Sequence, residues 1–167
     1  MSPSYTIVMG CDNAGCEYKT ALKADLEKDP RVKAVIDVGV NKGQEDYDTA
    51  YPHIGVAVGR TIAEGKADRG LLICGTGMGV AMAANKVPGI RASTAHDSFS
   101  VERLIKSNNA QVLCLGQRVI GLEVARKLVS EWLGHEFDET SASAEKVKVL
   151  LDYEKETGVR EEDVPKC

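Results

Sequence analysis

The chain has 167 residues, 43% of them hydrophobic and 28% charged, and a formal net charge of −4 at pH 7. These values are typical of one globular domain with a single core, which we expect to span residues 1–167. The acidic balance excludes the basic footprint of a nucleic-acid-binding protein. No apolar run reaches the roughly 18 residues that a membrane span requires. Small molecules are therefore the expected partners, with no nucleic acid and no membrane.

The cysteines and the amino-terminal residues indicate the cytoplasm. The five cysteines are odd in number and scattered, which favours reduced thiols over a disulfide framework. Residues 1–5 lack the basic and apolar regions of a signal peptide. We therefore expect a cytoplasmic protein with free thiols.

Strand and helix patterns alternate along most of the chain. In chain order, they predict a strand over 5–10, a helix over 14–28, a strand over 33–38, a loop over 41–48, a helix over 53–64, a strand over 69–74, a helix over 81–86, a strand over 90–95, a helix around 101–105, a strand over 111–115 and a helix after 121. This alternation predicts a three-layer, Rossmann-like α/β fold, with a five-stranded parallel sheet and helices on both faces.

The segment 135–167 departs from this alternation. Ser141 or Ser143 is a suitable cap for a further helix, along which Val147, Leu150, Leu151 and Tyr153 form an apolar stripe that ends at Gly158. No strand pattern accompanies this helix, so it has no part of the sheet to cover. We expect a C-terminal extension that forms its own unit or packs at a subunit interface.

The segment 71–79, LLICGTGMG, joins an apolar strand to a glycine-rich turn and a helix. In α/β proteins such a turn aims backbone N–H groups at an anion. Cys74 stands at its edge, which indicates chemistry on a carbonyl or an enediolate. The alternatives are that Cys74 is a small buried apolar residue and that the glycines only make a tight turn.

Ligands of parallel sheets bind outside the carboxyl ends of the strands. Asp12 and Asn13 follow the first expected strand, His96 follows the fourth and Arg118 follows the fifth. A carboxylate, an imidazole and a guanidinium are therefore expected beside the thiol of Cys74.

At these residues the chain resembles the ribose-5-phosphate isomerase type B family, which includes the galactose-6-phosphate isomerase subunits. The resemblance covers about residues 5–134. The matching segments are 10–12, 51–53, 73–79, 83–86, 89–92, 107–110 and 115–121. The resemblance implies a homodimer or higher homo-oligomer with an active site between two subunits. It also implies interconversion of aldose and ketose phosphates without a cofactor, and we expect no metal site.

The resemblance assigns roles to individual residues. Cys74 is the expected base that moves a proton between C1 and C2 through a cis-enediolate. Asp12 is expected to contact the sugar hydroxyls or to cap the first helix, and Thr76 to bond the thiolate or cap the next one. The other residues expected to bind substrate are Asn13, Gly75, Gly77, Met78, Gly79, Asn108, Arg118 and Lys146.

Three positions depart from the family pattern. Asn13 stands where the family often has histidine, and Ser107 stands where it often has the histidine that opens the sugar ring. Lys146 alone lies near the place of two C-terminal arginines. His96 is a candidate for the missing imidazole, with a cap for the following helix as its alternative.

These departures bear on the substrate. The leading expectation is ribose 5-phosphate and ribulose 5-phosphate, a reaction of the pentose phosphate pathway. The alternative is a tetrose 4-phosphate of the erythrose or erythrulose type, which needs no ring opening because its 4-oxygen is esterified. A third reading, from another class, is a non-catalytic module that binds a sugar phosphate or nucleotide. The thiol inside the glycine turn argues against that module, because binding needs only the glycines.

Overall fold

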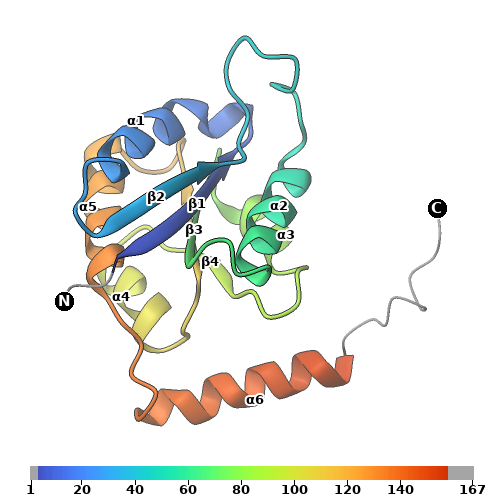
Figure 1. Cartoon of the computed structure of the whole chain (residues 1–167), viewed down its shortest axis with the longest axis vertical. Coiled ribbons are helices and arrows are strands. Elements are labelled where there is room, and N and C mark those ends of the chain that lie inside the picture. The colour runs from blue at the N-terminus through green and yellow to red at the C-terminus, as the bar shows by residue number, and fades with distance from the viewer. Residues whose placement is uncertain (1–3, 158–167) are drawn as a thin grey trace.

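The computed structural model describes residues 4–157, which form a central sheet, two covering layers of helices and one outlying helix (Figure 1). The elements are β1 (Tyr5–Cys11), the 3-10 turn η1 (Asn13–Gly15), α1 (Cys16–Leu26), β2 (Val32–Asp37), α2 (Tyr51–Ala63), β3 (Arg69–Cys74), α3 (Met78–Ala84), β4 (Ala92–Thr94), α4 (Ser98–Lys106), β5 (Val112–Gly116), α5 (Leu122–Gly134) and α6 (Ala142–Thr157). The strand order is β2-β1-β3-β5-β4, and every pairing is parallel. The predicted fold class is confirmed.

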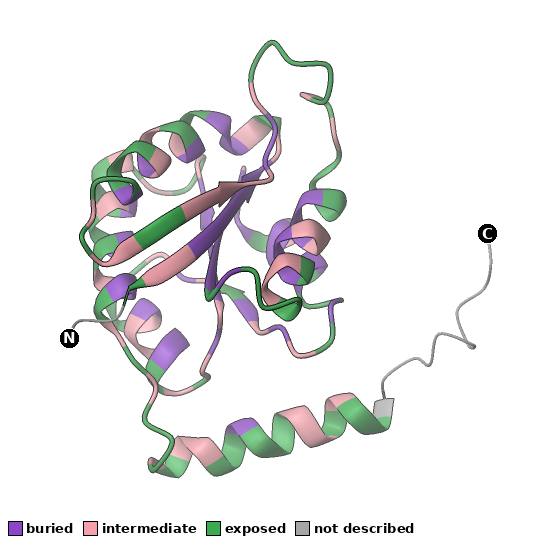
Figure 2. Cartoon of the chain, viewed as in Figure 1, coloured by how far each residue is buried: buried purple, intermediate pink, exposed green. Residues whose placement is uncertain are grey.

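Helices cover both faces of the sheet. α2 packs on β1 and β3, and α3 packs on α2 and on β3, β4 and β5, whereas α1, α4 and α5 lie on the opposite face (Figure 1). All residues of β3 and β5 are buried, while part of the edge strand β2 is exposed (Figure 2). The unbroken apolar runs of β3 and β5 therefore have the usual cause, which is burial on both faces of a parallel sheet.

Several element boundaries differ from the sequence prediction for local reasons. The side chain of Asp12 accepts a hydrogen bond from the Ala14 N–H, so the chain forms a 3-10 turn before α1 begins. α3 begins at Met78 rather than at residue 81, directly after Gly77, which has a φ of +82°. Glycine adopts this left-handed conformation without the steric cost of a side chain.

A buried lysine fixes the carboxyl ends of β1 and β2. Lys19 is 1% exposed, and its Nζ donates to both carboxylate oxygens of Asp37, to the Val40 carbonyl at 2.9 Å and to Asn41 Oδ1 at 2.8 Å. Burial acts to raise the pKa of Asp37, but hydrogen bonds from Lys19, the Gly39 N–H and Lys23 lower it below its ordinary value. This cluster holds the start of the loop between β2 and α2 against the end of β1, where the Val40 N–H donates to the Cys11 carbonyl at 3.1 Å.

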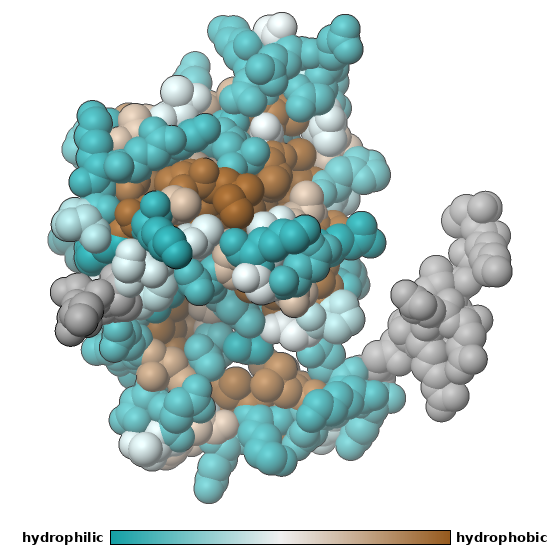
Figure 3. Space-filling model, viewed as in Figure 1, coloured by the Kyte–Doolittle hydropathy of each residue, from teal (hydrophilic) through white to brown (hydrophobic). Residues whose placement is uncertain are grey.

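The outlying helix α6 stands apart from the three layers (Figure 1). It contacts the body through Val147, which is buried, and through Glu154, whose carboxylate accepts the Gly89 N–H at 2.9 Å. Val149 and Leu150 are more than half exposed, and hydrophobic surface lies along this part of the molecule (Figure 3). The expected helix is thus present, while its expected end at Gly158 lies outside the described residues.

Candidate active site

The thiol of Cys74 lies at the mouth of a loop of backbone donors. Cys74 ends β3, and its Sγ accepts a hydrogen bond from the Gly77 N–H at 3.0 Å. Gly77 is the N-cap of α3, so the sulfur also lies at the start of a helix. A donor aimed at the sulfur and a helix amino terminus both stabilise negative charge. The geometry suits a thiolate base.

Two other thiols in neighbouring strands are poor candidates for a base. Cys11 and Cys114 are fully buried. Burial raises the pKa of Cys11 to about 12, and it also raises the pKa of Cys114. Both thiols therefore stay protonated near neutral pH, and neither reaches the protein surface.

The Cys74 loop is locked to the segment that follows β5. Residue 117 donates its N–H to the Cys74 carbonyl at 2.9 Å, and the Arg118 N–H donates to the Gly75 carbonyl at 3.0 Å. A methyl group added to Gly116 would lie 2.7 Å from the carbonyl carbon of Thr76, closer than any real contact. The two segments therefore touch backbone to backbone, and the loop is formed before any ligand binds.

A guanidinium and a carboxylate complete this edge of the sheet. A Cβ on Gly75 would lie 3.4 to 3.6 Å from Cδ, Nη1 and Nε of Arg118, so the arginine lies over the loop. Burial raises the pKa of Asp12, while the N–H groups of residues 14 and 15 and the charge of Arg118 act to lower it. Asp12 directly follows β1 and Arg118 follows β5, the two strands that flank β3 and Cys74 in the sheet. The predicted gathering of Asp12, Cys74 and Arg118 is therefore present.

His96 reaches the same edge in an unexpected way. Its Nε2 accepts a hydrogen bond from the Gly116 N–H at 2.9 Å. Burial lowers the pKa of this imidazole, and the nearby Asp97 opposes the shift. The cap of α4 is Asp97, whose Oδ1 accepts the Ser100 N–H at 2.8 Å. His96 is thus neither the helix cap nor an imidazole with both nitrogens available.

The remaining loop residues line the opening. Thr76 and Met78 are exposed, and Thr76 Oγ1 accepts a hydrogen bond from the Met78 N–H at 3.4 Å, although the N-cap of α3 is Gly77. Asn13 is exposed and its amide lies 3.4 Å from Asp48 Oδ1, on the loop before α2. The Gly75, Gly77 and Gly79 backbone follows the same turn.

Tyr51 is a site residue that the sequence reasoning passed over. A Cβ on Gly79 would lie 2.7 Å from the Tyr51 ring, so the phenol rests on the first turn of α3 beside the loop. The available indication was its position in the segment 51–53, which carries the family resemblance, immediately before a proline that begins a helix. Tyr51 is 42% exposed, so it remains accessible beside the loop.

Asn108 and Lys146 form a second group at the other end of β5. They line one hollow of about 190 Å³ together with Ser107 and Ser143. Arg91 holds the turn, since its Nε donates to the Asn108 carbonyl at 3.1 Å and its Nη2 to the Asn109 carbonyl at 2.6 Å. Residues that precede a parallel strand lie at the amino edge of the sheet, whereas Cys74 lies at the carboxyl edge. Within one chain, this group is therefore separated from Cys74 by the length of β5.

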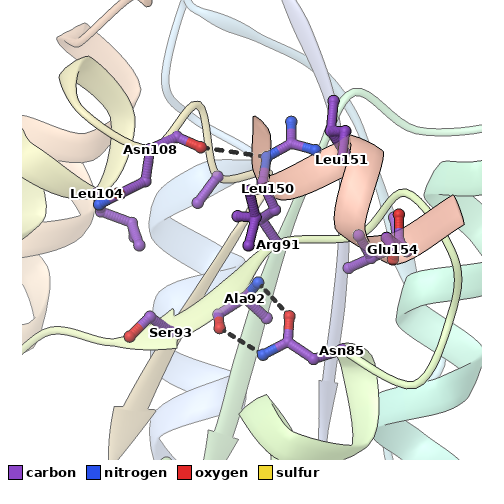
Figure 4. Close-up of a pocket in the computed structure, with 11 residues that line it drawn as sticks. Asn85, Arg91, Ala92, Ser93, Leu104, Asn108, Leu150, Leu151 and Glu154 are labelled. Atoms are coloured by element: carbon purple, nitrogen blue, oxygen red, sulfur yellow. Dashed lines mark hydrogen bonds between the residues drawn. The ribbon is translucent and has the colours of Figure 1, made fainter. Parts of the chain in front are cut away.

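A cavity of about 470 Å³ adjoins the second group, between β4 and α6 (Figure 4). Figure 4 shows Leu150, Leu151 and Glu154 of α6 on one side of it, and Asn85 bonded to the backbone of Ala92 on the other. Cys74 does not line this cavity. We therefore place the candidate active site at the thiol of Cys74 and its hydrogen-bond donors, and not in this cavity.

A thiol, a loop of N–H donors, a carboxylate and a guanidinium lie together at the carboxyl edge of the parallel sheet, an arrangement suited to proton transfer next to an oxyanion. The chain belongs to the ribose/galactose isomerase family, whose model matches residues 7–150. The resemblance seen in the sequence is confirmed, and the protein is a sugar-phosphate isomerase.

Individual relatives agree with this class. The chain is 63% identical over 148 residues to D-erythrulose-4-phosphate isomerase 2 of Mycolicibacterium smegmatis, covering 89% of this chain and 96% of the relative. It is 40% identical to D-erythrulose-4-phosphate isomerase of Pectobacterium atrosepticum, covering 89% and 95%. The solved ribose-5-phosphate isomerase B of Clostridium thermocellum superposes with a TM-score of 0.83 at 38% identity, covering 90% and 98%.

Within residues 4–157, every helix falls short of the length or apolar character that crossing a bilayer demands.

Proposed function

We propose that the protein interconverts D-erythrulose 4-phosphate and D-erythrose 4-phosphate through a cis-enediolate. The observation that carries the choice of a tetrose is the hydrogen bond from the Gly116 N–H to His96 Nε2. A furanose phosphate needs an acid or base group to open its ring before C1 and C2 can exchange a proton. The imidazole nearest to Cys74 already uses one nitrogen to hold the backbone.

The other two histidines are poorly placed for ring opening. His135 follows α5, where its carbonyl accepts a hydrogen bond from Arg69 at the start of β3, the opposite end from Cys74. His53 lies two residues after Tyr51 in α2, which turns it about 200° away from the face that meets Gly79. A substrate that is already open requires none of them, because a phosphate on O4 prevents closure to a five-membered ring.

The proposed reaction uses the groups at the carboxyl edge. Cys74 takes the proton from C1 of the ketose as a thiolate, the enediolate forms, and the proton returns to C2 to give the aldose. The N–H groups of the loop bond the enediolate oxygens, which carry the developing charge. Asp12 bonds the sugar hydroxyls, and Thr76 assists proton transfer between the two oxygens. Arg118 bonds the phosphate.

The relatives named as D-erythrulose-4-phosphate isomerases support this choice at 63% and 40% identity. They reverse the ranking that the sequence alone favoured, in which the pentose came first. Ribose 5-phosphate remains the second candidate, supported by the likeness to the Clostridium thermocellum enzyme and by the presence of Cys74, Asp12, Asn108 and Arg118.

We also propose a homodimer in the cytoplasm. Asn108 and Lys146 lie at the amino edge of the sheet, too far along β5 to serve the Cys74 of their own chain. A second copy related by a two-fold axis would bring this group to the Cys74 loop, and α6 supplies exposed apolar surface for the contact. A stable, active monomer in sedimentation at micromolar concentration would reject the dimer.

A substrate comparison tests the proposed function. The wild-type enzyme is incubated with the 4-phosphate of erythrulose, the 5-phosphate of ribose and the 6-phosphates of allose and galactose, and the isomeric product is followed by NMR. We expect kcat/KM for the tetrose to exceed that for ribose 5-phosphate by at least about a hundredfold, the effect of one missing acid–base group. A preference for the pentose would return the second candidate to first place.

A further inference from the structure

We infer that His96 is a positioning residue, whose neutral Nε2 holds the Gly116 N–H and thereby fixes the segment 115–118 against the Cys74 loop. This inference rests on the proposed function for its assay alone. The hydrogen bond of His96 is the same whichever sugar is the substrate, so the role of His96 and the proposed substrate can be disproved independently.

The hydrogen bond satisfies a donor that the sheet leaves open. β4 ends at Thr94, which is paired with Cys114, and the Ala95 N–H makes the last contact to the Cys114 carbonyl at 3.4 Å. Gly116 is buried and lies one step beyond this ladder. The imidazole of His96 provides the acceptor that a longer β4 would have supplied. Without it, a buried N–H would lose this partner, which is unfavourable for a donor removed from water.

The position of Gly116 decides the position of two catalytic features. The next two N–H groups along the chain bond the carbonyls of Cys74 and Gly75, and the Arg118 side chain lies over Gly75. Gly116 itself is in backbone contact with Thr76. A shift of this segment therefore moves the thiol loop and the guanidinium together.

Only the neutral imidazole can do this. A protonated ring presents N–H at both nitrogens, so Nε2 would face the Gly116 N–H as a second donor. Burial lowers the pKa of His96, with Asp97 acting to raise it. Other titratable side chains near this hydrogen bond include Arg103 of α4, which lines a hollow with Ala95, Cys114 of β5, and Cys74 and Arg118 on the segments bonded to Gly116.

The sign of the pH dependence follows from the lowered pKa. The unfolded chain takes up the proton near pH 6.5, whereas the folded chain resists it to lower pH. The hydrogen bond therefore contributes fully above about pH 6.5 and is lost as the pH falls through the value of the folded protein. We expect an acid limb in kcat that belongs to His96.

The test compares pH–rate profiles of the wild type, His96→Gln, His96→Ala and His135→Gln, each with whichever sugar phosphate the wild type turns over faster. The glutamine carbonyl accepts a hydrogen bond without titrating, so His96→Gln should retain activity near pH 8 and move the acid limb of kcat down by at least about one pH unit. His96→Ala should lower kcat about tenfold near pH 8, the effect of one hydrogen bond, and this difference should shrink at low pH, where the wild type loses the same bond.

His135→Gln is the matched control, because burial also lowers the pKa of His135 but at the opposite end of the sheet. Its profile should follow that of the wild type. The second ionisation of the substrate phosphate, near pH 6, is common to all four profiles and cancels in the comparison.

Two results would overturn the inference. An acid limb unchanged in His96→Gln would mean that another group titrates. A folded His96→Gln enzyme with no turnover at any pH would mean that the imidazole takes part in the chemistry itself. An NMR titration of the three histidines gives an independent readout: the His96 ring should be neutral and bonded at Nε2 at pH 7, and this signal should disappear in both variants.

Discussion

The two ends of β5 are held very differently. At its carboxyl end, the segment 116–118 is bonded to His96, to Cys74 and to Gly75, and a methyl group would not fit between the backbones. At its amino end, the turn at Asn108 borders open cavities, and α6 reaches the body through few contacts. The first region is closed by contacts within one chain, whereas the second is the one that the proposed dimer would complete.

The difference in rigidity corresponds to the role that we propose for each end of β5. Stabilising an enediolate requires dipoles that are already aimed before the charge develops, because reorganising them during the reaction costs free energy. Holding a phosphate requires mainly cationic and polar groups that can be supplied by another surface. A site shared between two copies can therefore keep its rigid part within one chain.

The largest expected effect comes from removing the thiol. Cys74→Ala should lower kcat by about 10²–10⁴, the contribution of a general base, while the variant stays folded. Cys16→Ala is the matched control, because Cys16 is a cysteine of similar burial that lies in α1. Steady-state kinetics of both variants provides the measurement. Near-normal isomerisation by Cys74→Ala would remove the thiol from the mechanism.

A smaller effect is expected from separating the two interlocked segments. Gly116→Ala places a methyl group against the backbone of Thr76, which cannot rotate away. We expect a loss of about 1–3 kcal/mol in unfolding free energy, as in overpacked cores, and a fall in kcat of about tenfold or more.

Gly121→Ala provides the comparison on the same connection, because nothing lies within 4 Å of its added Cβ. Thermal melting and kcat of this variant should stay close to the wild type. If the two alanine variants behave alike, the backbone contact at Gly116 does not matter to catalysis.

The smallest effect is expected at the open end of β5. Lys146→Gln should raise KM for the sugar phosphate about tenfold, the value of one charge-assisted hydrogen bond, with kcat changed far less. Lys148→Gln is the control two residues further along α6, since Lys148 pairs with Asp152 of the same helix at 2.8 Å. Equal KM values for the two variants would exclude Lys146 from phosphate binding.

Much of the fold could be predicted because burial leaves a plain pattern. β3 and β5 are buried on both faces and therefore read as unbroken apolar runs. The apolar periodicity predicts the start of α3 too late, at residue 81, because the φ of Gly77 decides where that helix begins. β4 proved shorter than expected, since as an edge strand it pairs on one side alone.

The candidate site likewise has features that the sequence could predict and features that it could not. The proximity of Asp12, Cys74 and Arg118 could be predicted from the sequence, because each lies at or just after the end of a strand and parallel strands share one carboxyl edge. The hydrogen bond between His96 and Gly116 could not, because it requires knowing that β4 and β5 are neighbours and that β4 stops at Thr94. The contact of Tyr51 with Gly79 likewise depends on how α2 packs on α3.

Mixing two impaired variants, assayed at substrate concentrations well below the wild-type KM, tests the shared site most directly. Cys74→Ala lacks the base, and a variant carrying both Asn108→Ala and Lys146→Gln lacks the second group. After unfolding and refolding together in equal amounts, half of the dimers are mixed, and each mixed dimer holds one intact site if the groups come from different chains. The account predicts recovery of about a quarter of the wild-type rate with D-erythrulose 4-phosphate. Activity no higher than that of the two variants assayed separately would contradict it.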